Sequence, residues 1–105
     1  MALTRQFTET IKQRAEKDPE FRIGLLTEAA ECFLNGEMAT GKTLLRDYVN
    51  ATIGFQELGK LVEKRPESLM RMLSDKGNPR AENLSLVIGS LREHEGIDLR
   101  VEAYR

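Results

Sequence analysis

The sequence predicts an all-α domain of five to six helices that ends in one short β-strand. Apolar residues recur at helical spacing through most of the chain. Glycine, asparagine and proline residues divide it into segments of helical length. The last segment, from Ile97, instead alternates apolar and polar residues with a period of two. With 105 residues, of which 40% are hydrophobic and 31% charged, the chain has the size and composition of a single globular domain.

Residues 1–53 are expected to form an N-terminal helical extension whose first two helices have clear boundaries. An amphipathic helix is predicted over residues 3–17. Asp18 can cap a second helix, and Pro19 suits its first position, so this helix is predicted to run to about Asn35. The apolar residues that define the first helix are spaced four apart and are Leu3, Phe7 and Ile11.

A phosphate-binding pattern occurs between the second and third helices. The stretch "GEMATGKT", residues 36–43, satisfies G-x-x-x-x-G-K-[ST]. Such a loop needs a buried strand before it, but the preceding residues have helical spacing. We therefore interpret Gly36 as the end of the second helix and expect Lys42 on the outer surface of a third helix, residues 38–50. The expected buried residues of that helix are Leu44, Leu45, Tyr48 and Val49.

Residues 54–96 predict three more helices. One spans about residues 55–62, a break follows at residues 63–65, and "PESLMRMLS", residues 66–74, begins with a proline that favours a helix start. Asn78, with Pro79, turns the chain into a last helix, and we expect Asn78 to cap it. The residues expected to face inward on these three helices are Leu58, Val62, Leu69, Met72, Leu73, Leu84, Val87, Ile88 and Leu91.

Two short helices joined by a three-residue break are typical of a helix-turn-helix. The helices of this motif cross closely, so a small residue is needed where they touch, and Gly59 supplies it. In this geometry the second helix, starting at Pro66, can enter the major groove of DNA while the first lies across the backbone.

The charge distribution also favours a nucleic-acid partner at this motif. The whole chain has a net charge of −1, but the window 60–80 holds six basic and three acidic residues, which leaves −4 for the rest. A local basic face on an acidic chain favours docking on phosphates.

The tail, residues 97–105, is predicted to be a half-buried strand. A single strand in a helical chain leaves an unpaired edge, which pairing with a second subunit would remove. We therefore expect a homodimer. The equally open alternative is that the tail folds back on its own chain.

The helix-turn-helix segment resembles a known family. "ESLMRMLSDKGNP", Glu67 to Pro79, followed by "ENLSLVIGSL", Glu82 to Leu91, is similar to the Xre (lambda-repressor-like) family, and most similar to its subgroup of addiction-module antidote proteins, or antitoxins. The resemblance covers residues 55–101 well and the upstream part more loosely. It implies a lambda-repressor-like DNA-binding domain in a bacterial antitoxin that represses its own promoter and binds a small basic toxin.

The turn departs from the family pattern of glycine, apolar residue and serine. Glu63, Lys64 and Arg65 occupy these positions. A glutamate in a left-handed conformation is strained, and the missing serine removes a helix N-cap.

The resemblance also implies site residues, by position in the motif. The candidates for reading bases are Arg65, Glu67, Met70 and Arg71, and the candidates for phosphate contacts are Gln56, Lys64, Lys76 and Arg80. Each charged side chain is also compatible with a solvated helix surface. Glu67 and Arg71, four residues apart, can instead pair with each other.

The sequence predicts a DNA-binding regulator that is not an enzyme and has no cofactor or metal. It has one histidine and one cysteine, and no cluster of catalytic residue types. Cys32 is expected to be a buried free thiol in a reducing compartment. With no apolar run long enough to cross a bilayer, the protein is expected to be cytoplasmic and off the membrane. Two other functions stay open: a stand-alone, phage-type repressor, and a helical protein-interaction module without DNA binding.

Overall fold

A computed structural model describes residues 5–105, with side chains from Thr10 onward, and shows six α-helices and no strand in this part of the chain. The helices lie close to the bounds that the sequence predicts, so the all-α prediction is confirmed. The predicted contributions of Leu3 and of the Phe7 side chain lie outside the described part. The helices are α1 Arg5–Lys17, α2 Pro19–Leu34, α3 Met38–Ala51, α4 Gly54–Val62, α5 Pro66–Met72 and α6 Ala81–Glu95.

Local sequence signals explain where α2 begins and ends. Asp18 is its N-cap, and the Oδ1 atom accepts a hydrogen bond of 3.2 Å from the backbone N–H of Phe21. Pro19 occupies the first turn, where a missing N–H costs nothing. Gly36, just beyond the helix, has φ +80°, the left-handed conformation in which glycine is favoured.

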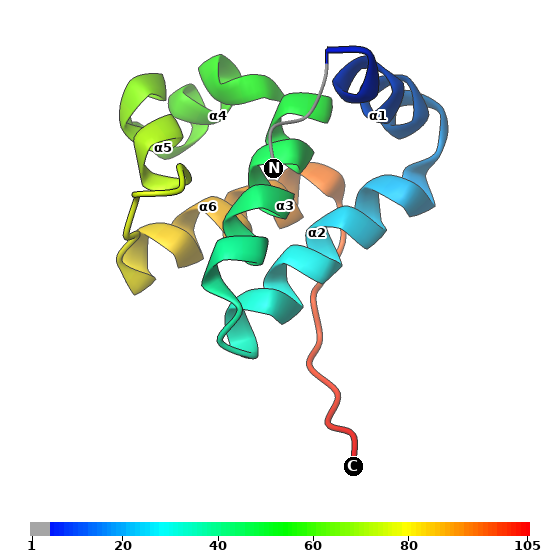
Figure 1. Cartoon of the computed structure of the whole chain (residues 1–105), viewed down its shortest axis with the longest axis vertical. Coiled ribbons are helices and arrows are strands. Elements are labelled where there is room, and N and C mark those ends of the chain that lie inside the picture. Colours follow the sequence, from blue (N-terminus) through cyan, green and yellow to red (C-terminus); the bar gives the residue numbers. More distant parts are fainter. Residues whose placement is uncertain (1–4) are drawn as a thin grey trace.

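Helix α3 lies at the centre of the molecule and packs against α1, α2 and α4 (Figure 1). Helix α6 packs against α4 and α2, and α5 packs against α4. The shared core takes side chains from five helices and from the residue after α5. These buried side chains are Leu26, Ala29, Leu45, Tyr48, Val49, Phe55, Leu58, Val62, Leu69, Leu73, Val87 and Leu91.

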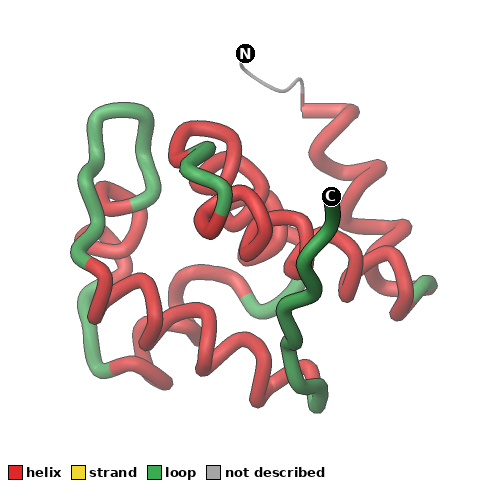
Figure 2. Tube along the Cα trace, turned by 90° about the horizontal axis from the view of Figure 1, so that it is seen from below, coloured by secondary structure: helices red, strands yellow, loops and turns green. Residues whose placement is uncertain are grey.

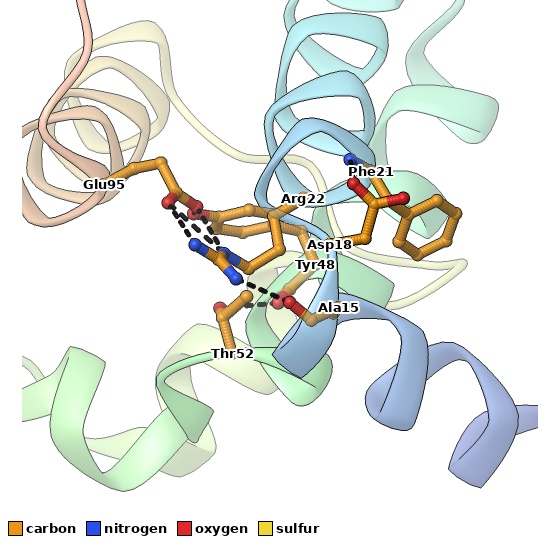
Figure 3. A network of polar contacts seen from close by, with 7 residues as sticks. All are labelled: Ala15, Asp18, Phe21, Arg22, Tyr48, Thr52 and Glu95. Carbon is orange, nitrogen blue, oxygen red and sulfur yellow. Dashed lines mark hydrogen bonds and ion pairs between the residues drawn. The ribbon is translucent and has the colours of Figure 1, made fainter.

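One carboxylate joins four helices (Figure 3). Glu95, at the end of α6, accepts a 2.6 Å hydrogen bond from the Tyr48 hydroxyl of α3 and pairs with Arg22 of α2 at 3.2 Å. The Arg22 guanidinium also donates to the backbone oxygen of Ala15 in α1 at 2.6 Å. Burial, followed by the hydrogen bond to Glu95, raises the pKa of Tyr48, so the neutral phenol is strongly favoured.

The predicted C-terminal strand is not formed. Residues 97–105 leave the end of α6 and extend away from the helices (Figure 1), and they have no regular secondary structure (Figure 2). Ile97 packs against the core, but Val101 and Tyr104 are 76% and 86% exposed. A strand needs a partner for its backbone hydrogen bonds, and the described part of this helical chain offers none.

The expected outward position of Lys42 is wrong. Residues 38–43 are the first turns of α3 rather than an open loop between a strand and a helix, so the loop that the phosphate-binding pattern requires is not formed. The Phe33 ring leaves no room for a side chain at Gly41, because a Cβ at that position would lie 2.7 Å from the ring. Lys42 is only 6% exposed, and its ammonium bonds to backbone carbonyls between α5 and α6.

Candidate nucleic-acid interface

Helices α4 and α5 pack against each other across a three-residue turn, and Gly59 lies where the turn and the start of α5 approach α4. A Cβ at Gly59 would be 2.7 Å from the backbone oxygen of Lys64 and 3.5 Å from the ring of Pro66. The N–H of Lys64 donates to the Gly59 oxygen at 3.0 Å. The prediction that a small residue is required here is confirmed, and the close approach fixes the angle at which α5 leaves the turn.

The turn between α4 and α5 has a left-handed glutamate and lacks a side-chain N-cap, the two features expected from its sequence. Glu63 adopts φ 55° and ψ 46°, the left-handed region that a glutamate enters only with strain. Arg65 is the N-cap of α5, but its side chain makes no capping hydrogen bond. Helix α5 is therefore held at its start by Pro66 and by packing rather than by a cap.

Helix α5 turns its predicted base-reading residues to solvent. Leu69 and, just after the helix, Leu73 are fully buried, and Met72 is half-buried against the core. The exposed residues on the opposite side include all four candidates: Arg65, Glu67, Met70 and Arg71. Helix α1 lies at the far end of the molecule from α5 in both views (Figures 1 and 2).

A basic hollow opens beside α5. We use this name for an open concavity of about 640 Å³ between the turn before α5, α5 itself, the loop after it and the start of α6. No acidic residue of the described chain lines it. Its basic lining residues are Lys64, Arg65, Arg71, Lys76 and Arg80. Side chains that are up to sixteen positions apart in sequence thus surround one space.

The cations of the basic hollow are mostly unpaired. The side chains of four of them form no hydrogen bond or ion pair with another described residue. These four are Lys64, Arg71, Lys76 and Arg80. The proposed pairing of Glu67 with Arg71 does not occur. Glu67 instead lies 3.9 Å from the Nε atom of Arg65, and this exposed pair contributes little stability.

The structure brings some predicted site residues together and leaves others apart. Of the phosphate candidates, Lys64, Lys76 and Arg80 line the basic hollow, whereas Gln56 is exposed on the first turn of α4 and does not. Glu67 and Met70 lie outside it on the exposed side of α5. Asn78 lines the hollow but does not cap α6, because the chain turns into the helix only at Arg80.

Sequence reasoning missed two residues that support this region from behind. Lys42 and Arg46 of α3 donate hydrogen bonds to backbone oxygens of the segment after α5. Their spacing is the signal that was available: together with Leu45 and Val49 they follow the helical spacing that marks the buried face of α3.

The residues that the structure describes include neither an activated thiol nor a cluster of metal ligands. Cys32 is buried as expected, and burial and then Glu37 raise the pKa of its thiol, which disfavours the reactive thiolate. Among the described residues, no three histidine, cysteine or acidic side chains lie close enough together to hold a metal ion. No described helix is both long and apolar enough to cross a membrane.

The chain matches no protein-family model, no curated protein and no solved structure.

Proposed function

We propose that the protein is a sequence-specific DNA-binding transcriptional regulator that reads its operator with α5. The observation that carries this proposal is the basic hollow. Five cations from the turn, from α5 and from the loop after it surround one exposed space, and most of them have no protein partner. Unpaired Lys and Arg side chains beside an exposed helix are what docking on a DNA backbone requires.

The arrangement of α4 and α5 supports the same proposal. Arg65 and Arg71 are the side chains best suited to guanine, because a guanidinium can bond its O6 and N7 atoms together. Met70, 45% exposed, suits a thymine methyl group, and Glu67 suits a cytosine amine. Lys64, Lys76 and Arg80 would contact phosphates of the DNA backbone. Gln56 would contact a phosphate of the DNA strand that α4 crosses.

We propose a homodimer on a pseudo-palindromic operator with half-sites about one helical turn apart. The exposed tail supports this assembly. Its apolar side chain at Val101 and its extended backbone are free to pair with the same segment of a second copy.

We further propose that the protein is the antitoxin of a toxin–antitoxin module in the cytoplasm and represses the shared promoter. The net charge of −4 outside the window 60–80 suits a basic toxin. Finding a gene for a small basic toxin next to the gene for this protein would support the antitoxin role. Its absence, with DNA binding retained, favours a stand-alone repressor.

Fluorescence anisotropy with the protein's own promoter DNA tests the DNA-binding proposal. Arg71→Ala is expected to lower specific affinity by about 1–3 kcal/mol if Arg71 reads a base. Lys12→Ala is the matched control, because it removes an exposed cation from α1, far from α5. Parent protein that binds promoter DNA no better than unrelated DNA would instead indicate a protein-interaction module.

A truncation after Gly96 tests the dimer. Sedimentation of the full chain is expected to give a dimer and that of the truncated chain a monomer. The full chain should also protect two half-sites, and the truncated chain should bind them independently. A dimer that persists without the tail contradicts the role given to this segment.

A further inference from the structure

Two side chains of α3 hold the segment that follows α5. The Nζ atom of Lys42 donates to the backbone oxygens of Asp75 at 3.2 Å and Gly77 at 2.7 Å. The Nη1 atom of Arg46 donates to the backbone oxygen of Leu73 at 2.7 Å. Among the described residues of α3, no other side chain bonds to this segment. We call Lys42 and Arg46 the α3 clamp.

The α3 clamp matches the electrostatics of the place it occupies. The carbonyl groups at the end of a helix have no intrahelical partners and carry the negative end of the helix dipole. Arg46 meets this condition at Leu73, the C-cap of α5. Lys42 instead satisfies the carbonyls of Asp75 and Gly77, which belong to the loop beyond the helix. Lys42 is only 6% exposed, so its ammonium is committed to these carbonyls and is not available to a ligand in solvent.

The segment that the clamp holds has little freedom. A Cβ at Gly77 would collide with the backbone oxygens of Arg71 and Met72, so the chain lies directly on the last turn of α5. The N–H of Gly77 donates to the Ser74 oxygen at 3.0 Å. The two carbonyls held by Lys42 stand on either side of Lys76, a cation that lines the basic hollow.

We infer that Lys42 and Arg46 are positioning residues for phosphate binding. They hold the wall of the basic hollow from behind, so that Lys76 is directed at a backbone phosphate of the DNA. This inference rests on the proposed function. The lysine of the "GEMATGKT" stretch then serves phosphate recognition through the segment it holds, without touching a phosphate.

The test replaces the clamp cation with a side chain of similar length. Lys42→Met keeps the apolar stem and deletes the donors, and Lys12→Met removes the same charge from the exposed face of α1. Affinity for promoter DNA is measured across salt concentrations. Loss of one phosphate contact makes the fall of log affinity with log salt less steep by about 1, and lowers affinity about eightfold at 0.1 M salt. We expect both changes for Lys42→Met and neither for Lys12→Met.

A double mutant separates this role from a general loss of stability. If Lys42 acts through Lys76, the pair Lys42→Met with Lys76→Ala binds no more weakly than Lys76→Ala alone. Additive losses, or an unchanged salt slope for Lys42→Met, would overturn the inference. If Lys42→Met does not fold, Arg46→Met provides the same comparison.

A readout without DNA keeps this inference separate from the proposed function. Amide hydrogen exchange at Gly77 is expected to accelerate at least tenfold in Lys42→Met, because the segment loses its two anchored carbonyls. If the parent binds no DNA and Gly77 exchange still accelerates, the proposed function fails and the clamp stands as a structural element only. If the amide exchange rate of Gly77 is the same in Lys42→Met as in the parent, Lys42 does not hold this segment and the inference is wrong.

Discussion

Glu63 sets the backbone geometry of the turn between α4 and α5. Of the described residues other than glycine, it alone has a positive φ. Its backbone N–H still donates to the Gly59 oxygen, which closes α4 with a left-handed cap. A glycine would adopt the same conformation without strain, so the glutamate leaves the turn less stable than it can be.

Glu63→Gly is expected to raise the free energy of unfolding by about 0.5–1 kcal/mol. The substitution removes a left-handed strain of about 1–2 kcal/mol, offset by the larger freedom of glycine in the unfolded chain. Urea denaturation measures the difference. Glu28→Gly, at an exposed position inside α2, is the control and should lower stability by about 0.5–1 kcal/mol. If both glycine variants lower the free energy of unfolding, Glu63 is not strained in the parent.

At the scale of elements, the contact between α4 and α5 decides how the proposed recognition helix is presented. The two helices are short and joined by three residues. Their angle therefore depends on how closely the backbones approach at Gly59. Because the nearest atom to a Cβ there is a backbone oxygen, no side-chain rotation can relieve the contact.

Gly59→Ala is expected to destabilise the protein by about 1–3 kcal/mol through overpacking. Gly89→Ala is the matched control: Gly89 lies inside α6, and apart from its chain neighbours and the backbone of its own helix no atom lies within 4 Å of a Cβ there. Alanine at this position should stabilise the protein by about 0.5–1 kcal/mol. Thermal and urea unfolding of both variants measure these changes. A Gly59→Ala variant as stable as the parent would mean that the helices are not held this closely.

At the scale of the whole molecule, Glu95 ties the three N-terminal helices to α6. Arg22 and Tyr48 reach it from α2 and α3, and Arg22 extends the connection to α1 (Figure 3). The paired carboxylate is nearly buried, with its side chain 9% exposed. A buried charge of this kind is strongly destabilising when it loses its partners.

Tyr48→Phe is expected to lower the free energy of unfolding by about 1.5–3 kcal/mol, the contribution of a hydrogen bond to a charged group. Tyr104→Phe, at a residue that is 86% exposed, should change nothing and is the control. Equal stability of Tyr48→Phe and the parent contradicts the role of the network.

The same network predicts a pH dependence. The pKa of Tyr48 is raised in the folded protein, so the folded state holds the phenolic proton more tightly than the unfolded state. This contribution is fully present below the ordinary pKa of 10.0 and is lost as the pH rises above it. The parent should therefore lose stability above pH 10 more steeply than Tyr48→Phe.

Local signals in the sequence determined the helices, their limits and the inward-facing residues. Asp18 and Pro19 start α2, Gly36 ends it, and Gly59 marks the close approach of α4 and α5. Each of these effects acts within a few residues along the chain, so periodicity and capping preferences suffice to find them.

Only the tertiary structure decided what Lys42 does, which cations share the basic hollow and whether the tail forms a strand. The bond from Lys42 to Gly77 spans 35 positions and depends on how α3 packs beside the end of α5. The period-two pattern of the tail specifies two faces, but a strand also needs a second backbone to bond with. Whether such hydrogen-bond partners are present depends on how distant segments pack together, and the residue pattern within one segment does not determine that packing.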